Sequence, residues 1–252
     1  MSPSNLPILG CVSNGGKDIY GSFTDLSGKN LLCIGFSEAE IEQLVEKYDP
    51  SKITALTNWT EHGDAMVKKY PLVIGDITKR TEFPDNSFDA VLTLSVLEHL
   101  GDLHGAFDEM TRLVKNGGEM LHVFGPAWSC AYGHHLYANP DDKLLAFTSW
   151  QLPAHMHLLC SHDEIVNYYV EMGYPESAGH VAIHWFYQTP LINRVFYDDY
   201  MKIFEEDRFQ IDHMEIMYND LPRDHIVRLQ KSYPGNRNFS NYGGKYKLVV
   251  RK

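Results

Sequence analysis

The sequence lacks the marks of a nucleic-acid-binding or membrane-spanning protein. Its 252 residues include 22 Lys and Arg against 33 Asp and Glu, a formal net charge of −11, and no basic run that would follow a phosphate backbone. No apolar stretch approaches the roughly 20 residues needed to cross a bilayer. Residues 1–10 hold no basic region followed by an apolar one. We therefore expect a cytoplasmic protein with neither a nucleic-acid nor a membrane partner.

Cysteine is scarce as well. The four cysteines, Cys11, Cys33, Cys130 and Cys160, form no Cys-x-x-Cys pair and predict no disulfide framework. Internal repeats and low-complexity tracts are also missing. A chain of this length, 44% of it hydrophobic, can bury a sizeable core without cross-links. We expect free thiols in a reducing compartment.

What is present is an alternation of short apolar runs and amphipathic segments from residue 30 onward. Helices are expected at 37–48, at 64–69 and at 103–114, and the first opens with a capping box of Ser37 and Glu40. The apolar runs end at glycine or polar residues, as buried parallel strands do. Strands are expected at 30–35, 52–57, 72–75, 88–95, 119–124, 210–217 and 245–250.

This alternation predicts an α/β fold with a doubly wound, mostly parallel sheet of seven strands. The strands at 210–217 and 245–250 are expected to pair antiparallel at one edge. In the second half we also expect helices at 161–172, opened by a second capping box, and at 191–206, with a loop-rich connection at 219–242. Ligands of such sheets bind beyond the carboxyl ends of the strands, so the residues just after each strand are candidates for a site.

One stretch, residues 75–118, carries a group of motifs and reads GDITKRTEFPDNSFDAVLTLSVLEHLGDLHGAFDEMTRLVKNGG. Its marks are Gly75-Asp76 after the third strand, Phe83-Pro84-Asp85 before the fourth, Val96 to Leu100 after the fourth, Arg112, and Lys115 to Gly118 before the fifth. Taken together, these motifs resemble those of class I S-adenosylmethionine-dependent methyltransferases of the UbiE/type 11 kind.

The resemblance implies a Rossmann-like methyltransferase sheet with an inserted cap region, in a single domain. Within residues 1–252 we expect an N-terminal arm at 1–29 and a cofactor-binding core at 30–125. An acceptor-binding cap insertion is expected at 126–210, and C-terminal edge strands with a loop at 211–252.

The resemblance also assigns residues to S-adenosyl-L-methionine. Asp76, at the carboxyl end of a strand, is expected to accept a hydrogen bond from adenine N6. Ile77 is expected to offer a backbone amide and an apolar contact. Ser95 and Val96, after the fourth strand, are expected to pass close under the sulfonium.

The first half of the cofactor motif departs from the family pattern. Cys33 stands where the family has an acid, Gly35 is kept, and Ser37 and Ala39 replace the later glycines. Glycines at such a turn let the backbone approach a ligand, and the amides of the following helix receive its carboxylate. The capping box at Ser37 leaves fewer of these donors for the methionine group.

The second strand departs from the pattern too, because Thr57-Asn58-Trp59 replaces an acid that binds the ribose hydroxyls. Asn58 is expected to hydrogen-bond a ribose hydroxyl and Trp59 to stack on adenine. We expect the cofactor to bind through these substitute contacts together with Gly35 and Ser37. The alternative is a site that has drifted and no longer methylates.

A histidine-rich segment, residues 125–162, follows the fifth strand, where the family places acceptor-binding residues. Three interpretations of its imidazoles stay open. In the first, they line the acceptor pocket and one serves as general base. The candidates are then His134, His135 and His155, followed by Tyr132.

In the second interpretation, His134, His135, His155 and His157 bind a divalent metal ion. An extended backbone at 155–157 would point two of these rings to opposite faces, and a turn there would remove that objection. In the third, the segment is an aromatic-rich lid in which the histidines are packing residues.

The sequence thus predicts transfer of a methyl group from S-adenosyl-L-methionine to an oxygen or nitrogen of a small polar acceptor, such as a sugar-linked or natural-product biosynthetic intermediate. The reaction would be an in-line displacement, catalysed mostly by positioning and by exclusion of water. One alternative is a non-catalytic protein that keeps the fold for binding or scaffolding. The other is a metal-dependent enzyme on the same fold that uses the histidine-rich segment.

Overall fold

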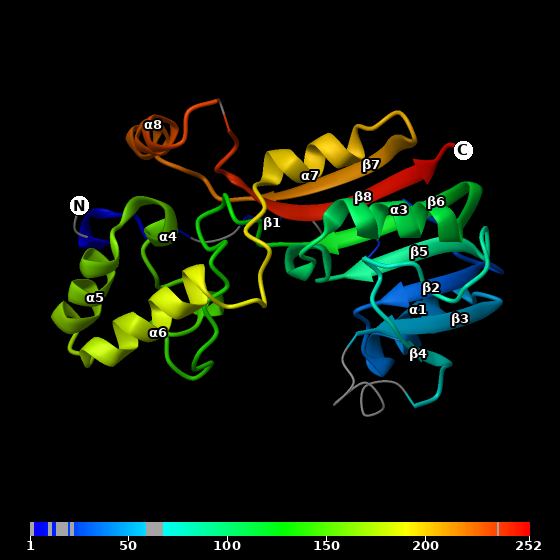
Figure 1. The fold of residues 1–252 in the computed structure, drawn as a ribbon, viewed down its shortest axis with the longest axis horizontal. Coiled ribbons are helices and arrows are strands. Elements are labelled where there is room, and N and C mark those ends of the chain that lie inside the picture. Colours follow the sequence, from blue (N-terminus) through cyan, green and yellow to red (C-terminus); the bar gives the residue numbers. More distant parts are fainter. Residues whose placement is uncertain (1–2, 10–11, 14–19, 21–22, 59–67, 236) are drawn as a thin grey trace. The chain divides into compact units, whose positions relative to one another are not determined.

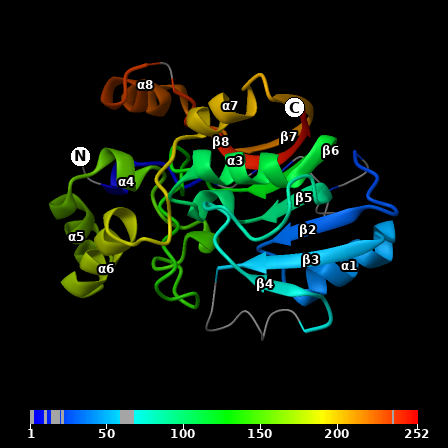
Figure 2. The same cartoon turned by 45° about the vertical axis from the view of Figure 1, so that its right-hand side comes forward.

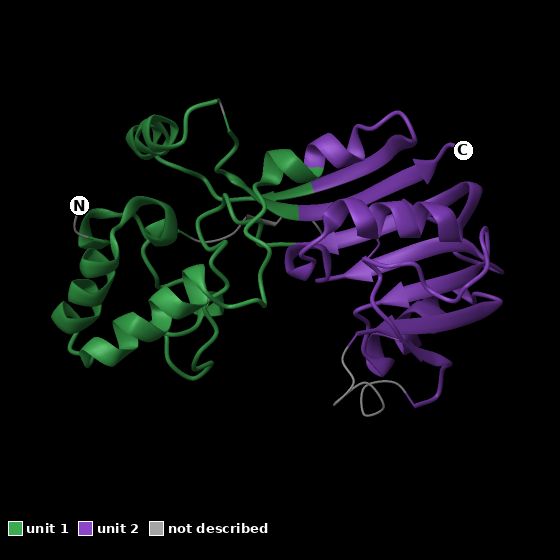
Figure 3. Cartoon of the chain, in the orientation of Figure 1, with its two compact units in different colours: residues 1–14, 125–200, 216–243 green, residues 15–124, 201–215, 244–252 purple. Residues whose placement is uncertain are grey.

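The computed structural model describes residues 3–9, 12–13, 20, 23–58, 68–235 and 237–252 (Figures 1 and 2). The chain divides into two compact units, each assembled from separate stretches of sequence (Figure 3). Unit 1 comprises residues 1–14, 125–200 and 216–243, and unit 2 comprises residues 15–124, 201–215 and 244–252.

Unit 2 is built on a sheet whose inner strands run parallel. The strands are β2 (Asn30–Ile34), β3 (Lys52–Thr57), β4 (Leu72–Ile74), β5 (Phe88–Leu94), β6 (Val114–Phe124), β7 (Phe209–Tyr218) and β8 (Asn241–Val250), in the spatial order β7-β8-β6-β5-β2-β3-β4. The neighbours from β4 to β6 pair in parallel, and β8 pairs antiparallel with β6. β7 lies beside β8 and runs in the opposite direction (Figure 1). The predicted α/β sheet is confirmed.

Successive side chains of a strand point to opposite faces of the sheet. Both faces of this sheet are covered by helices. On one face, Cys33 of β2 packs in a buried cluster with Ile41 and Leu44 of α1 (Glu38–Tyr48). On the other, Phe107 of α3 (Leu103–Leu113) lies 5.1 Å from the His122 ring of β6, measured between ring centroids. The sheet is therefore doubly wound, as predicted.

The order in which the chain adds strands to the sheet reverses at β2. From β2 it first adds β3 and β4 on one side, and then it crosses over to add β5 and β6 on the other. The carboxyl ends of these parallel strands share one edge, and the loops that leave β2 and β5 diverge there. This is the place where open α/β sheets bind ligands.

Two helices begin at the predicted capping boxes. At α1, Ser37 Oγ accepts from the Glu40 N–H at 3.4 Å, and the Ser37 N–H donates to the Glu40 carboxylate at 2.7 Å. Ser161 and Glu164 form the same pair of bonds at α5 (His162–Glu171). Both boxes satisfy amides that the first helical turn leaves without partners.

Unit 1 has a hydrophobic core of its own, which includes Tyr132, Tyr169 and Phe186. α5 packs on α6 (Glu176–Tyr187) at Gly179, where a Cβ would lie 2.6 Å from the Val166 Cα. The two-residue strand β1 (Val12–Ser13) pairs antiparallel with the end of β7.

None of the helices that the structure describes is long and apolar enough to cross a membrane. The remaining helices are α4 (Met156–Leu159), α6 (Glu176–Tyr187), α7 (Tyr197–Phe204), α8 (Arg223–Ser232) and the 3₁₀ turns Pro3–Asn5, Leu97–His99 and Phe147–Ser149.

One expectation for the second half of the chain is wrong. The helix expected at 191–206 is shorter, because Arg194 has a left-handed φ of 57° and the Asn193 side chain accepts from the Val195 N–H. The connection 219–242, expected to be loop-rich, contains α8 between irregular stretches. The helix expected at 64–69 lies largely outside the described residues.

Candidate functional site

A hollow that is open to solvent lies at the carboxyl edge of unit 2. Every residue that lines it ends or follows one of the strands β2, β3, β4 and β5. The lining residues are Ile34, Gly35, Leu56, Thr57, Asn58, Gly75, Asp76, Ile77, Val96 and Leu100. One carboxylate and one carboxamide are thus set among aliphatic side chains, which suits a ligand with apolar faces and a polar edge.

The structure brings most of the predicted cofactor residues together here. Gly35, Asn58, Asp76, Ile77 and Val96 line the hollow. Ser37 and Ser95 do not line it. Ser95 directly follows β5, and Ser37 lies in the loop between β2 and α1. Ser95 has an exposed side chain and a left-handed φ of 50°. Trp59 lies outside the described residues.

The carboxylate of Asp76 already has partners. Its Oδ1 accepts from the Thr78 N–H at 3.0 Å and from Thr78 Oγ1 at 2.7 Å, and its Oδ2 lies 3.2 Å from Lys79 Nζ. Burial raises the pKa of Asp76, but the bonds from Thr78 and Lys79 outweigh it, so the pKa lies below its usual value. Asp76 is therefore ionised at neutral pH. Its Oδ2, which pairs with the exposed Lys79, is the oxygen best placed for a ligand N–H.

Gly35 lets the end of β2 approach β5 very closely. Its φ is 80°, and a Cβ on it would lie 2.3 Å from Val96 Cγ2 and 2.6 Å from the Leu94 carbonyl oxygen. Both the backbone conformation and the space therefore require glycine. The glycine that survives from the motif shapes the wall of the hollow.

The N-terminus of α1 is closed by its own side chains. The N–H and the hydroxyl of Ser37 both donate to Glu40 Oε2, each at 2.7 Å. The Glu40 charge thus occupies a position where a helix dipole would attract an anionic ligand group. Cys33, at the position where the resemblance expects an acid, is fully buried, and burial raises the pKa of its thiol. It stays neutral and does not replace the missing carboxylate.

The predicted histidine candidates all lie in unit 1, where hydrogen bonds define their tautomers. His155 Nε2 lies 3.2 Å from the Phe239 carbonyl oxygen, which can only accept, so Nε2 carries the proton. His155 Nδ1 therefore accepts, and His225 Nε2, 3.0 Å away, donates to it. Sequence reasoning missed His225, because nothing in the local pattern links two residues 70 positions apart.

His134 and His157 lie beside each other, with ring centroids 5.2 Å apart. The Leu136 N–H donates to His134 Nδ1 at 3.0 Å, and His157 Nε2 donates to the Trp128 carbonyl at 2.8 Å. Burial lowers the pKa of His157 to about 4 and holds those of His134 and His155 well below 6.5. These imidazoles are neutral at physiological pH.

Tyr132 and His135 are also hydrogen-bonded within unit 1. The Tyr132 hydroxyl accepts from the Leu9 N–H at 3.0 Å and donates to the Leu9 carbonyl at 2.7 Å. His135 Nδ1 donates to the Gly133 carbonyl at 2.8 Å, which leaves Nε2 as the basic nitrogen. His135 is 7% exposed, whereas the other three predicted catalytic residues are fully buried.

The four histidines considered as metal ligands do not converge, and all four are among the described residues. No three of them bring ligating nitrogens within 4.8 Å of one another. His155 has a left-handed φ of 59° and is the N-cap of α4, so the His155 and His157 rings stack at 6.4 Å instead of pointing to opposite faces. Among themselves, these four histidines therefore form no metal site.

We predict that Gly35→Ala destabilises unit 2 by about 1–3 kcal/mol more than Gly28→Ala does, because its Cβ overlaps Val96 and Leu94. Gly28 also has a positive φ, 66°, but a Cβ there meets nothing within 4 Å. The control therefore reports the conformational cost alone, roughly 1 kcal/mol. Urea unfolding measures both variants, and equal losses of stability would contradict the packing argument.

We predict that unit 1 loses stability as the pH falls below 6.5. The unfolded chain binds protons at about pH 6.5, whereas folded His157 resists them down to about pH 4. Between these values, each such histidine lowers the free energy of unfolding by about 1.4 kcal/mol for every unit by which the pH falls. Urea unfolding, followed by tryptophan fluorescence at several pH values, measures the slope.

His157→Gln should reduce this slope, and His180→Gln, which changes an exposed histidine of α6, should leave it unchanged. A stability that does not vary with pH in this window would show that the buried histidines are not held neutral.

Comparisons with known proteins agree with this geometry. Residues 18–122 match the family described as a methyltransferase domain. A sterol 24-C-methyltransferase of Aspergillus fumigatus is 38% identical over 74 residues, a match that spans 29% of this chain and only 18% of that protein.

Two solved structures share the fold. A methyltransferase from Methanosarcina mazei, 16% identical, aligns over 93% of this chain and 99% of its own with a TM-score of 0.51. An S-adenosylmethionine-dependent methyltransferase from Mesorhizobium loti, 11% identical, aligns over 90% of this chain and 93% of its own with a TM-score of 0.52. Residues 18–122 of this chain thus match a methyltransferase domain, and the chain shares its fold with solved methyltransferase structures.

Proposed function

We propose that the hollow of unit 2 binds S-adenosylmethionine and that the chain methylates an oxygen or nitrogen of a small polar acceptor. The observation that carries this proposal is the convergence of Gly35, Asn58, Asp76 and Ile77 on one hollow at the point where the strand order reverses. When bound, S-adenosylmethionine supplies a methyl group on a positively charged sulfur.

The lining residues fit the adenosine half of this cofactor. Asp76 Oδ2 is assigned to the adenine amine, and the aliphatic side chain of Ile77 to the apolar face of the ring. The exposed carboxamide of Asn58 is assigned to a ribose hydroxyl. Val96, against Gly35, is assigned to the neighbourhood of the sulfonium.

The methionine half is assigned to Ser37 and Ser95. Ser95 directly follows β5 and is exposed, and Ser37 is the N-cap of α1. Because Glu40 already occupies the helix N-terminus, we expect this half to contribute less of the binding free energy than the adenosine half.

On the acceptor side, we assign the general base to His135. Its Nδ1–H donates to the Gly133 carbonyl, so Nε2 is the basic nitrogen of this ring. His134, His155 and Tyr132 are fully buried and make hydrogen bonds within unit 1, so we assign them to holding the segment in place.

We predict that Asp76→Asn weakens S-adenosylhomocysteine binding about tenfold, measured by calorimetry. Thr78 donates twice to one oxygen of Asp76, and an amide that keeps this arrangement turns its NH₂ toward the adenine amine. Lys79→Ala is the matched control, because it removes the ion pair of Asp76 and leaves the carboxylate. It should bind as well as wild type or slightly better. Equal affinity of wild type and Asp76→Asn would refute this assignment.

We predict that His135→Ala lowers methyl transfer by about 10²-fold or more while the affinity for S-adenosylhomocysteine stays unchanged. The assay follows radiolabelled methyl groups from S-adenosylmethionine into the small molecules of a cell extract. Binding without any transfer by wild type would support the scaffold alternative. Transfer that a chelator abolishes would support the metal-dependent alternative.

A further inference from the structure

The segment that leads from the hollow back to β5 contains no helix or strand. It covers residues 75–87, and its first residues, Gly75, Asp76 and Ile77, line the hollow. The Gly75 N–H donates to the Thr57 carbonyl at 2.8 Å, which anchors the start of the segment on β3. From Thr78 onward, contacts from α3 hold the segment.

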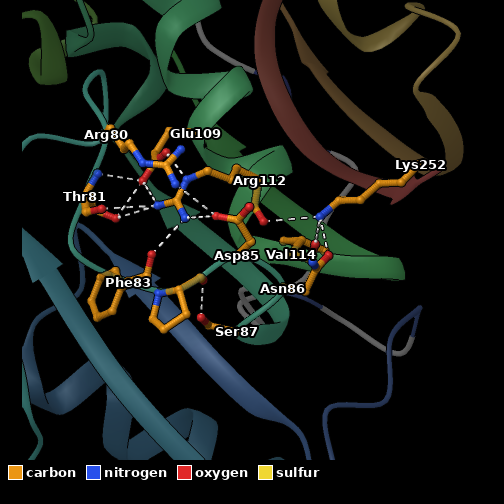
Figure 4. Close-up of polar contacts among 11 residues, drawn as sticks. Arg80, Thr81, Phe83, Asp85, Asn86, Ser87, Glu109, Arg112, Val114 and Lys252 are labelled. Carbon is orange, nitrogen blue, oxygen red and sulfur yellow. Dashed lines mark hydrogen bonds and ion pairs between the residues drawn. The ribbon is translucent and has the colours of Figure 1, made fainter.

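Arg112, in the last turn of α3, binds this segment with a single guanidinium (Figure 4). Nη1 donates to the Phe83 carbonyl at 2.8 Å and to Asp85 Oδ1 at 2.6 Å, and Nη2 reaches the Thr81 carbonyl at 3.3 Å. The Arg112 side chain is only 13% exposed. Three alternate residues of an irregular segment are thus tied to one buried cation.

Glu109 completes this cluster from the same helix. It accepts from Arg112 Nε at 2.7 Å and Nη2 at 2.6 Å, a bidentate pair. Its Oε1 also accepts from the N–H and the hydroxyl of Thr81, at 2.7 and 2.6 Å. Because Glu109 is 5% exposed, it depends on Arg112 for charge compensation.

α3 also contacts the segment at a residue closer to the hollow than Thr81. A Cβ on Gly105, in the first turn of α3, would lie 2.7 Å from the Thr78 carbonyl oxygen, so helix and segment touch here as well. Thr78 in turn donates its N–H and its hydroxyl to Asp76. One helix therefore contacts the segment at Thr78 and again at Thr81, on the side that leads to Asp76.

We propose that Arg112 is a positioning residue for Asp76 and Ile77, and that it sets the affinity of the hollow through the 75–87 segment. This inference rests on the proposed function, in which the hollow binds the cofactor. Arg112→Lys tests it, because an ammonium keeps the charge but cannot bond Glu109, Asp85 and two carbonyls together. Asp108→Asn is the matched control, since it breaks a surface ion pair of α3 with Arg208 and touches no part of the segment.

Two measurements on the full chain are expected to change together. In the ligand-free protein, Arg112→Lys should speed hydrogen exchange of the amides of residues 76–82 at least tenfold. S-adenosylhomocysteine should bind at least tenfold more weakly, measured by calorimetry. Asp108→Asn should change neither, even where both variants lower the melting temperature equally.

Unchanged exchange at residues 76–82 in Arg112→Lys would overturn the inference, whatever happens to binding. Faster exchange with unchanged affinity would also overturn it, because the segment would then be irrelevant to the hollow. Failure of wild type to bind S-adenosylhomocysteine would instead overturn the proposed function, and with it the cofactor role of the segment. The exchange measurement would still show whether Arg112 holds residues 76–82.

Discussion

The parallel pairing of β2 with β3 on one side and β5 on the other is the constraint on which the site depends. It places the carboxyl ends of these strands at one edge of the sheet. The glycine that follows β2 then tightens the arrangement, because only a residue without a Cβ fits between Val96 and the Leu94 carbonyl. The hollow is therefore a consequence of strand order and close packing.

Two carboxylates at or near the hollow bond the local backbone. Asp76 builds the turn with Thr78 and offers its second oxygen outward. Glu40 closes the start of α1 and adds a negative charge there. In the site that we propose for S-adenosylmethionine, the adenosine half therefore has the better ordered contacts, and the methionine half has fewer groups than an intact glycine motif would provide.

Much of the sheet could be predicted from the sequence, because buried parallel strands appear as short apolar runs. The run at 52–57 matches β3 residue for residue. The start of α7 could not be predicted, because the left-handed Arg194 is invisible to hydrophobic periodicity. Gly35 and Asp76 could be found because they follow strands. The partners of Arg112, 27 to 31 positions away, and the His155–His225 pair depend on tertiary packing.

A crystal structure of the chain with S-adenosylhomocysteine tests the central claim most directly, because it shows where the nucleoside binds. The account predicts the adenine amine within hydrogen-bond distance of an Asp76 carboxylate oxygen and the ribose beside Asn58. A nucleoside bound elsewhere in the chain, with the hollow of unit 2 closed, would contradict it.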